Sequence, residues 1–98
     1  IDVPVLAGFG EDDRLVPLEN IRRFRNELQQ LEKRARVQVF ADTPHGWMNT
    51  TRDEYRHEAS ERAWELINSF FREAFAGQWA EPRVDFAVDD GVAFDFGI

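Results

Sequence analysis

The stretch Val3-Pro4-Val5-Leu6-Ala7-Gly8-Phe9 sets the class of fold, because it is a short and almost continuous apolar run. Strands that are buried on both faces have this pattern, and they belong to parallel sheets covered by helices on both sides. Pro4 is tolerated near the start of a strand, where its missing N–H is not needed for pairing. An acidic turn, Gly10-Glu11-Asp12-Asp13, follows the run. We therefore expect an α/β protein whose first strand covers residues 3–9.

A helix and a second strand follow this turn. Pro17 presets the backbone for a first helical turn. Apolar side chains then recur at helical spacing, at Leu18, Ile21, Phe24, Leu28 and Leu31. The helix should end near Lys33-Arg34, since cations suit a helix carboxyl end. Residues 36–41 predict the second strand, which should be parallel to the first and reached by a right-handed crossover.

The last predicted helix covers roughly residues 56–75. Its apolar positions also recur at helical spacing: Ala59, Ala63, Ile67, Phe70, Phe71 and Ala74. Gly77 is a natural stop for this helix, because glycine readily adopts the left-handed conformation that ends many helices. The resulting order is βαβα, and we assign residues 1–76 to one domain.

The pattern changes after Gly77, and residues 77–98 are assigned to an extension. Two short runs alternate between apolar and other residues: Val84, Phe86 and Val88, then Val92, Phe94 and Phe96. A three-residue loop at 89–91 would pair the two runs and place their apolar side chains on one face. We expect a β-hairpin over 84–96 that packs against the rest of the chain, because an isolated hairpin is only marginally stable.

Composition narrows the classes of function. A net charge of −7 at pH 7 argues against a nucleic-acid partner, since phosphate binding needs a basic face. The chain has no cysteine, so it supplies no disulfide, no thiolate metal site and no cysteine nucleophile, which fits a cytoplasmic location. No apolar run approaches the roughly 18 residues of a membrane span, so we expect no membrane partner. Because the chain opens directly on a core strand, we expect it to be a piece of a longer protein.

Two residues carry the candidate chemistry. Asp13 follows the first predicted strand, and His45 follows the second within Thr43-Pro44-His45-Gly46-Trp47. Functional groups of an open parallel sheet gather at the carboxyl ends of its strands, so these side chains should meet there. A carboxylate can fix the tautomer of an imidazole that takes a proton from a nucleophile. Three alternatives stay open: Asp13 as a turn carboxylate, His45 as a merely polar loop residue, and Asp12 in the place of Asp13.

The motifs around these residues resemble the carboxyl-terminal part of the dienelactone hydrolase family (carboxymethylenebutenolidases), which has the α/β-hydrolase fold. The resemblance runs from Ile1 to about Ala76, and its main pieces are Gly10-Glu11-Asp12-Asp13-Arg14-Leu15-Val16-Pro17 and Pro44-His45-Gly46-Trp47. In that family a Gly-x-x-Asp-x-x-Val-Pro turn carries the acid of a catalytic triad, which implies Asp13. A His-Gly-aromatic motif carries the base, which implies His45. The resemblance also implies a three-layer α/β/α fold, hydrolysis of carboxylic esters or lactones, and no metal or organic cofactor.

One part of the family's machinery has no counterpart in this chain. The nucleophile elbow, Gly-x-Cys-x-Gly or Gly-x-Ser-x-Gly, is absent, and Ser60 and Ser69 fall inside the last predicted helix. The first hypothesis is therefore the acid-and-base part of a dienelactone-hydrolase-like esterase. The alternative is a non-catalytic interaction or assembly module derived from a hydrolase fragment. A third hypothesis is an enzyme assembled across chains that uses one of the two serines.

Further expectations concern substrate and partners. Trp47 could line an acyl pocket or only pack the loop, and Arg14 could steer a carboxylate substrate or be an ordinary surface cation. Glu11, Asp12 and Asp13 are not assigned to a metal, because no second oxygen cluster supports one. Two strands with exposed edges and a small core predict a partner, either another copy (a homo-oligomer) or an amino-terminal segment. A small-molecule ester or lactone is the expected substrate once that partner completes the site.

Overall fold

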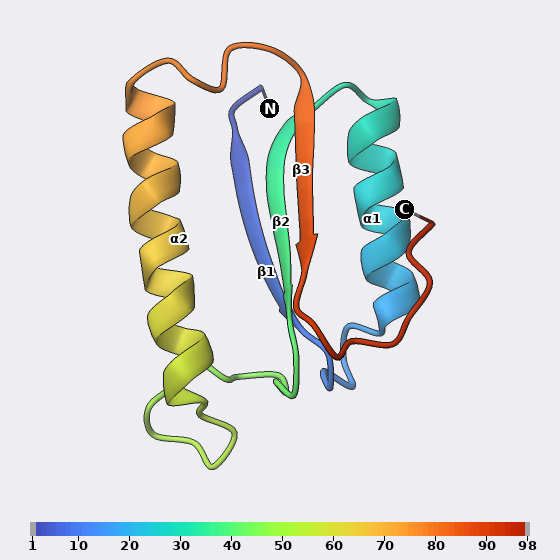
Figure 1. Cartoon of the computed structure of the whole chain (residues 1–98), viewed down its shortest axis with the longest axis vertical. Helices are drawn as coiled ribbons and strands as arrows, with labels where there is room; N and C mark the ends of the chain where they lie inside the picture. The colour runs from blue at the N-terminus through green and yellow to red at the C-terminus, as the bar shows by residue number, and fades with distance from the viewer. Residues whose placement is uncertain (1, 98) are drawn as a thin grey trace.

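The computed structural model describes residues 2–97. It contains β1 (Val5–Gly10), α1 (Leu18–Gln30), β2 (Arg34–Phe40), α2 (His57–Phe75) and β3 (Arg83–Val88). The three strands form one parallel sheet in the order β1-β2-β3, with α1 on one side and α2 on the other (Figure 1). The expectation of an α/β protein with parallel strands is confirmed. Ile1 and Ile98, the outer limits of the predicted domain and extension, lie outside the described residues.

A separate hydrophobic core lies on each face of the sheet. The core toward α1 is built around the buried Ile21, Val37, Val39 and Phe96. The core toward α2 is built around the buried Phe40, Trp47, Ala59 and Ala63. Successive side chains of a strand point to opposite faces, so β2 contributes Val37 and Val39 to one core and Phe40 to the other. Burying a large side chain such as Phe40 contributes about 1.5–3 kcal/mol to the free energy of unfolding.

Both helices end in the same backbone motif. Glu32 (φ 53°) adopts a left-handed conformation, and the amides of Glu32 and Lys33 donate to carbonyls of the last turn of α1. This arrangement is a Schellman motif, and Gly77 (φ 77°) forms the same motif after α2. The helix α1 therefore ends a few residues before the predicted Lys33-Arg34. Neither of these two described helices combines the length and the apolarity that crossing a membrane requires.

The two crossover connections have opposite hands. The helix α1 joins β1 to β2 and α2 joins β2 to β3, so both connections advance across the sheet in the same direction. The helices nevertheless cover opposite faces (Figure 1). Connections with this geometry cannot both be right-handed, although nearly all parallel crossovers are. The usual handedness rule therefore does not predict where β3 lies.

The predicted β-hairpin over 84–96 is wrong. Its first run is β3, which pairs in parallel with β2 along its whole length. Its second run, 92–97, forms no strand in the part of the chain that the structure describes. A turn does lie between the runs, where the amide of Val92 bonds to the carbonyl of Asp89 at 3.4 Å. The alternating pattern identified a strand and its apolar face but not its partner, and the expected free edge of β2 is covered by β3.

The second run packs over α1 instead of forming a strand. Phe96 is 3% exposed, and its ring centroid lies 5.1 Å from that of Phe86 and 4.7 Å from that of Phe94. The guanidinium of Arg25 in α1 donates a hydrogen bond to the carbonyl of Phe96. Most apolar side chains expected in the hairpin thus pack on the α1 face of the sheet, where Phe96 is buried and Phe86, Val88, Val92 and Phe94 are partly buried.

Trp79, which the sequence analysis did not single out, anchors the connection between α2 and β3 to the helix. Its indole is almost completely buried, packs against Phe70 and donates to Glu73 at 3.1 Å. The guanidinium of Arg83 lies 3.8 Å from the indole centroid, a cation–π distance. These contacts fix the start of β3 beside the end of α2.

Candidate acid–base site

The loops that follow β1 and β2 bring Asp13 and His45 together. The two strands are parallel neighbours, so their carboxyl ends lie side by side at the lower end of the sheet in Figure 1. The Nδ1 atom of His45 lies 2.9 Å from Oδ2 of Asp13, which is a hydrogen-bond distance. Asp13 makes this contact, while Asp12 is exposed. Because 32 positions separate the pair in sequence, the contact depends on the folding of the whole β1-α1-β2 unit.

The other oxygen of Asp13 holds its own turn. Oδ1 accepts hydrogen bonds from the backbone amides of Leu15 at 2.8 Å and Val16 at 3.1 Å, and the side chain is 7% exposed. Burial alone would raise the pKa of Asp13. The hydrogen bonds from His45 and from the two amides outweigh burial, so the pKa lies below its ordinary value of 3.8. Asp13 is therefore ionised at neutral pH, and it is both a turn carboxylate and the partner of His45.

The ionised Asp13 fixes the tautomer of His45. A carboxylate only accepts hydrogen bonds, so the contact with Asp13 requires the proton of the neutral imidazole to be on Nδ1, which leaves a lone pair on Nε2. The His45 side chain is 53% exposed and lines a cavity of about 460 Å³. The walls of the cavity are Gly8, Phe9, Asp13, Val16, His45, Gly46, Trp47, Met48 and Asn49. An imidazole held in this way can accept a proton from a group bound beside it.

A close approach of backbone to backbone sets the distance between the two loops. A Cβ atom on Gly10 would lie 2.0 Å from the carbonyl oxygen of Thr43. That carbonyl accepts a hydrogen bond from the amide of Asp12 at 3.0 Å, and Thr43 is buried. Any side chain at position 10 would force the loops apart. Gly10 is thus part of the site although it carries no functional group.

Trp47 lines the cavity and packs the loop at the same time. Its ring is buried, and its centroid lies 4.8 Å from that of Phe40. The two predicted alternatives for Trp47 are therefore compatible with each other. Arg14 is exposed and is not among the residues that line the cavity. The structure brings Asp13, His45 and Trp47 together and leaves Arg14 outside this group.

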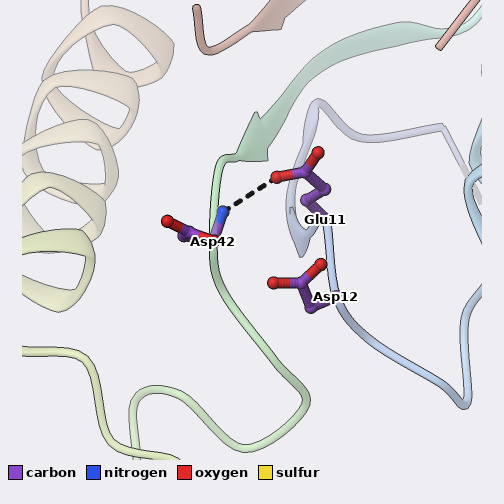
Figure 2. Close-up of side chains that lie close together, drawn as sticks. All are labelled: Glu11, Asp12 and Asp42. Carbon is purple, nitrogen blue, oxygen red and sulfur yellow. Dashed lines mark hydrogen bonds between the residues drawn. The ribbon is translucent and has the colours of Figure 1, made fainter. Parts of the chain in front are cut away.

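Three carboxylates gather beside the site (Figure 2). Glu11 and Asp12 follow β1 and Asp42 follows β2, and one oxygen atom of each lies within 4.8 Å of the others. Glu11 accepts a hydrogen bond from the amide of Asp42 at 2.9 Å, drawn as the dashed line in Figure 2. Asp42 was missing from the acidic group considered in the sequence, because it joins that group only when β1 and β2 pair. The contact ties the two loops together, and we assign no metal to it.

No serine, threonine, tyrosine or cysteine lines the cavity among residues 2–97. Ser60 is buried within α2, and Ser69, farther along the same helix, accepts a hydrogen bond from Arg72. His57, the other histidine, lies at the exposed start of α2, at 3.0 Å from the hydroxyl of Tyr55. Among the described residues, the wall of the cavity therefore holds a carboxylate and an imidazole but no hydroxyl or thiol beside them.

Sequence reasoning missed two residues that support the site, Gly10 and Asp89. Asp89 follows β3 directly and accepts a hydrogen bond from the amide of Ala41, the first residue after β2. In the sequence Asp89 stands before Asp90-Gly91, a pattern that turn chemistry explains by itself. Only the position of β3 beside β2 could have connected Asp89 with the loop that carries His45.

Comparison with known proteins places the chain in a family. The model of the dienelactone hydrolase family matches residues 1–75, which leaves β3 and the following residues outside the match. A protein of Escherichia coli (strain K12) named "Putative carboxymethylenebutenolidase" is 23% identical over 73 residues. The alignment covers 74% of this chain and 27% of that protein, so the chain spans about a quarter of its relative. No solved structure gives a significant match. Because the family model covers well over half of its length, the chain belongs to the dienelactone hydrolase family.

Proposed function

We propose that the chain is the acid-and-base part of a hydrolase that acts on carboxylic esters or lactones. The observation that carries this proposal is the contact between His45 and Asp13 at the wall of a cavity, in a chain of the dienelactone hydrolase family. His45 would be the general base, and Asp13 would orient it and stabilise its imidazolium form. The nucleophile and the oxyanion donors would come from sequence outside this chain.

The proposed reaction is acyl transfer in two stages. As the nucleophile attacks the carbonyl carbon, its proton moves to Nε2 of His45, and Asp13 offsets the positive charge of the imidazolium. The leaving alcohol takes this proton when the ester C–O bond breaks, and water then releases the acid by the same route. Trp47 and Met48 give the cavity an apolar wall suited to the carbon part of a substrate. These steps use no metal or organic cofactor, and a steering role for Arg14 stays a prediction.

We further propose that a partner binds along β1, either another copy of the chain or an amino-terminal segment. Among the described strands, none pairs with the outer edge of β1. Trp64, Phe71 and Phe75 form an exposed aromatic stripe along α2. Arg62 bonds to Asp89 on the β3 side of the helix. Residues two positions apart on a helix point to roughly opposite sides, so Trp64 and the rest of the stripe face the β1 side. A cytoplasmic location and the absence of nucleic-acid and membrane partners also stay predictions of the sequence.

A second candidate function is a non-catalytic interaction or assembly module. Two observations favour it: no nucleophile lines the cavity within residues 2–97, and the surface beside β1 is apolar and exposed. In this case the contact between Asp13 and His45 would only stabilise the two loops.

Hydrolysis of p-nitrophenyl acetate distinguishes the two functions. The assay uses the product of the whole reading frame that contains this chain. His45→Ala is expected to lower kcat/KM by about 10²- to 10⁴-fold, the usual contribution of a general base. His57→Ala is the matched control, because it removes the other histidine from an exposed position, and it should leave the rate unchanged. Equal rates for wild type and His45→Ala, whether fast or at background, would overturn the hydrolase proposal, and background rates would favour the assembly module.

A further inference from the structure

Four hydrogen-bond donors converge on the carboxylate of Asp89. Oδ1 accepts from Nε2 of Gln38 at 3.1 Å and from Nη2 of Arg62 at 2.5 Å. Oδ2 accepts from the amide of Ala41 at 3.1 Å and from Nη1 of Arg62 at 2.8 Å. The side chain is largely buried. Asp89 therefore connects the end of β2, the helix α2 and the end of β3 at a single point.

The charge of Asp89 is stabilised by the same contacts. The hydrogen bonds from Arg62 lower the pKa of this carboxyl, burial opposes them, and the amide of Ala41 lowers it further, so that the pKa lies below the ordinary value of 3.8. Two-pronged pairing of guanidinium with carboxylate also fixes the orientation of both groups. Asp89 is thus a rigid acceptor for the amide of Ala41.

The segment that Asp89 holds leads directly to His45. The carbonyl of Ala41 accepts a hydrogen bond from the Thr43 hydroxyl at 2.7 Å, and the carbonyl of Thr43 accepts one from the amide of Asp12 at 3.0 Å. Continuous contacts therefore run from Asp89 through the loop to the turn that carries Asp13. On the opposite side the loop is held by Glu11, Asp12 and Asp13, which follow β1. Without Asp89 the loop would have no anchor on the β3 side among these bonds.

We propose that Asp89 is a positioning residue for His45. By holding the amide of Ala41 and tying it to α2 through Arg62, Asp89 sets where the imidazole meets Asp13. This role rests on the proposed function of His45 as a base, but the geometry that it controls is measurable without hydrolysis. The family model matches residues 1–75, so Asp89 lies outside the match. The carboxylate that holds the amide of Ala41 therefore belongs to the segment that follows the matched region.

The test is NMR spectroscopy of the His45 ring in the 98-residue chain. In the wild type, a downfield proton signal from Nδ1–H and the ¹⁵N shifts of the ring report which tautomer of His45 is present. A His57→Gln variant removes the signals of the other histidine and so assigns the remaining ones to His45. Asp89→Asn keeps the shape of the side chain, but its NH₂ group must face two of the four donors. We expect the Nδ1–H signal to broaden or disappear and the ring to populate both tautomers.

Asp85→Asn is the matched control. Asp85 is a carboxylate within β3, four residues before Asp89, and it pairs with Arg36 at 3.4 Å and Arg83 at 3.2 Å, away from the His45 loop. Loss of the signal in Asp89→Asn with retention in Asp85→Asn supports the proposal. Retention in both variants, or equal loss in both, overturns it.

A second variant covers the case in which Asp89→Asn does not fold. Arg62 is exposed on α2, so Arg62→Gln should fold, and it frees the carboxylate of Asp89 to swing away from Ala41. The Nδ1–H signal should weaken while the helical circular dichroism stays unchanged, and an unaltered signal would overturn the proposal. In the hydrolysis assay, Asp89→Asn should lower kcat roughly tenfold to a hundredfold with little change in KM, as expected for a misplaced base. A lost signal with an unchanged kcat would count against the proposed function and leave the positioning role in place.

Discussion

The two oxygens of Asp13 serve different partners, one holding the turn before α1 and the other holding His45. An asparagine could still accept the amides of Leu15 and Val16 with its single oxygen, but its NH₂ group would then face the imidazole. Asp13→Asn therefore separates the structural role of this residue from its electrostatic role. The same substitution at Asp12, whose side chain is exposed, serves as a control for charge alone.

The pH dependence of stability tests the charge of Asp13. Its pKa is lower in the folded chain than its ordinary 3.8, so at acid pH the unfolded state binds the proton more tightly. The contribution of Asp13 to stability is therefore complete above its unfolded pKa and is lost as the pH falls through its folded pKa. Urea unfolding at pH 7 should show Asp13→Asn to be less stable by about 1–3 kcal/mol. The difference should shrink below about pH 4, and a constant difference, or an equal one for Asp12→Asn, would contradict this account.

The sequence indicated that Asp13 and His45 would meet, because both follow strands that a crossover makes neighbours. The spacing alone left Asp12 and Asp13 open, and only the family motif favoured Asp13. It could not indicate Gly10 as a contact residue, since the carbonyl that excludes a side chain there belongs to Thr43, 33 positions later. A residue such as Gly10, which matters only because it lets two loops approach each other, has no functional group that the sequence could point to. Its role can be recognised only once the positions of both loops are known.

At the scale of elements, the local pattern located both helices and all three strands to within a few residues. What it could not give was the partner of β3. A period of two fixes which side chains share a face, and it is equally consistent with a hairpin and with a parallel strand. The turn at 89–91 favoured the hairpin because that turn is real, as the bond between Val92 and Asp89 shows. The strand β3 pairs instead with β2, whose residues lie more than 40 positions earlier in the sequence.

Phe96 tests whether the segment after β3 is an integral part of the fold. It is 3% exposed in the core of the α1 face, so Phe96→Ala should lower the free energy of unfolding by about 3–5 kcal/mol or leave the chain unfolded. Leu31→Ala is the matched control, because Leu31 is 65% exposed and lies outside the aromatic stripe of α2, and it should change stability by no more than about 0.5 kcal/mol. Urea unfolding followed by circular dichroism measures both. Equal effects of the two substitutions would show that 92–97 does not stabilise the sheet.

At the scale of the whole molecule, the two edges of the sheet differ in character. The outer edge of β3 carries Arg83 and Asp85 and is preceded by Pro82, all features that disfavour pairing with another strand. The edge of β1 carries no charged residue between Val5 and Gly10. With the aromatic stripe of α2 on the same side, β1 is the edge at which the proposed partner would pair.

Light scattering coupled to size-exclusion chromatography tests this surface. The 98-residue chain on its own is expected to self-associate, because its uncharged edge and exposed aromatic side chains are available to a second copy. Replacing Trp64 and Phe71 with serine should return it to a monomer. Leu31→Ser, an apolar position exposed at the end of α1, is the control and should leave the association unchanged. A wild-type chain that is monomeric and melts cooperatively would contradict the prediction.

The charged residues of β3 also limit the number of chains that can join in one sheet. A sheet with a single uncharged edge can be extended in one direction only. When two chains join through β1, each has used that edge, and the complex ends in a β3 strand on both sides. When a segment of the same polypeptide occupies β1, the edge is used within one molecule. In the arrangement of two chains, both outer strands of the complex are β3, and their charged residues disfavour further pairing and therefore oppose open-ended fibres.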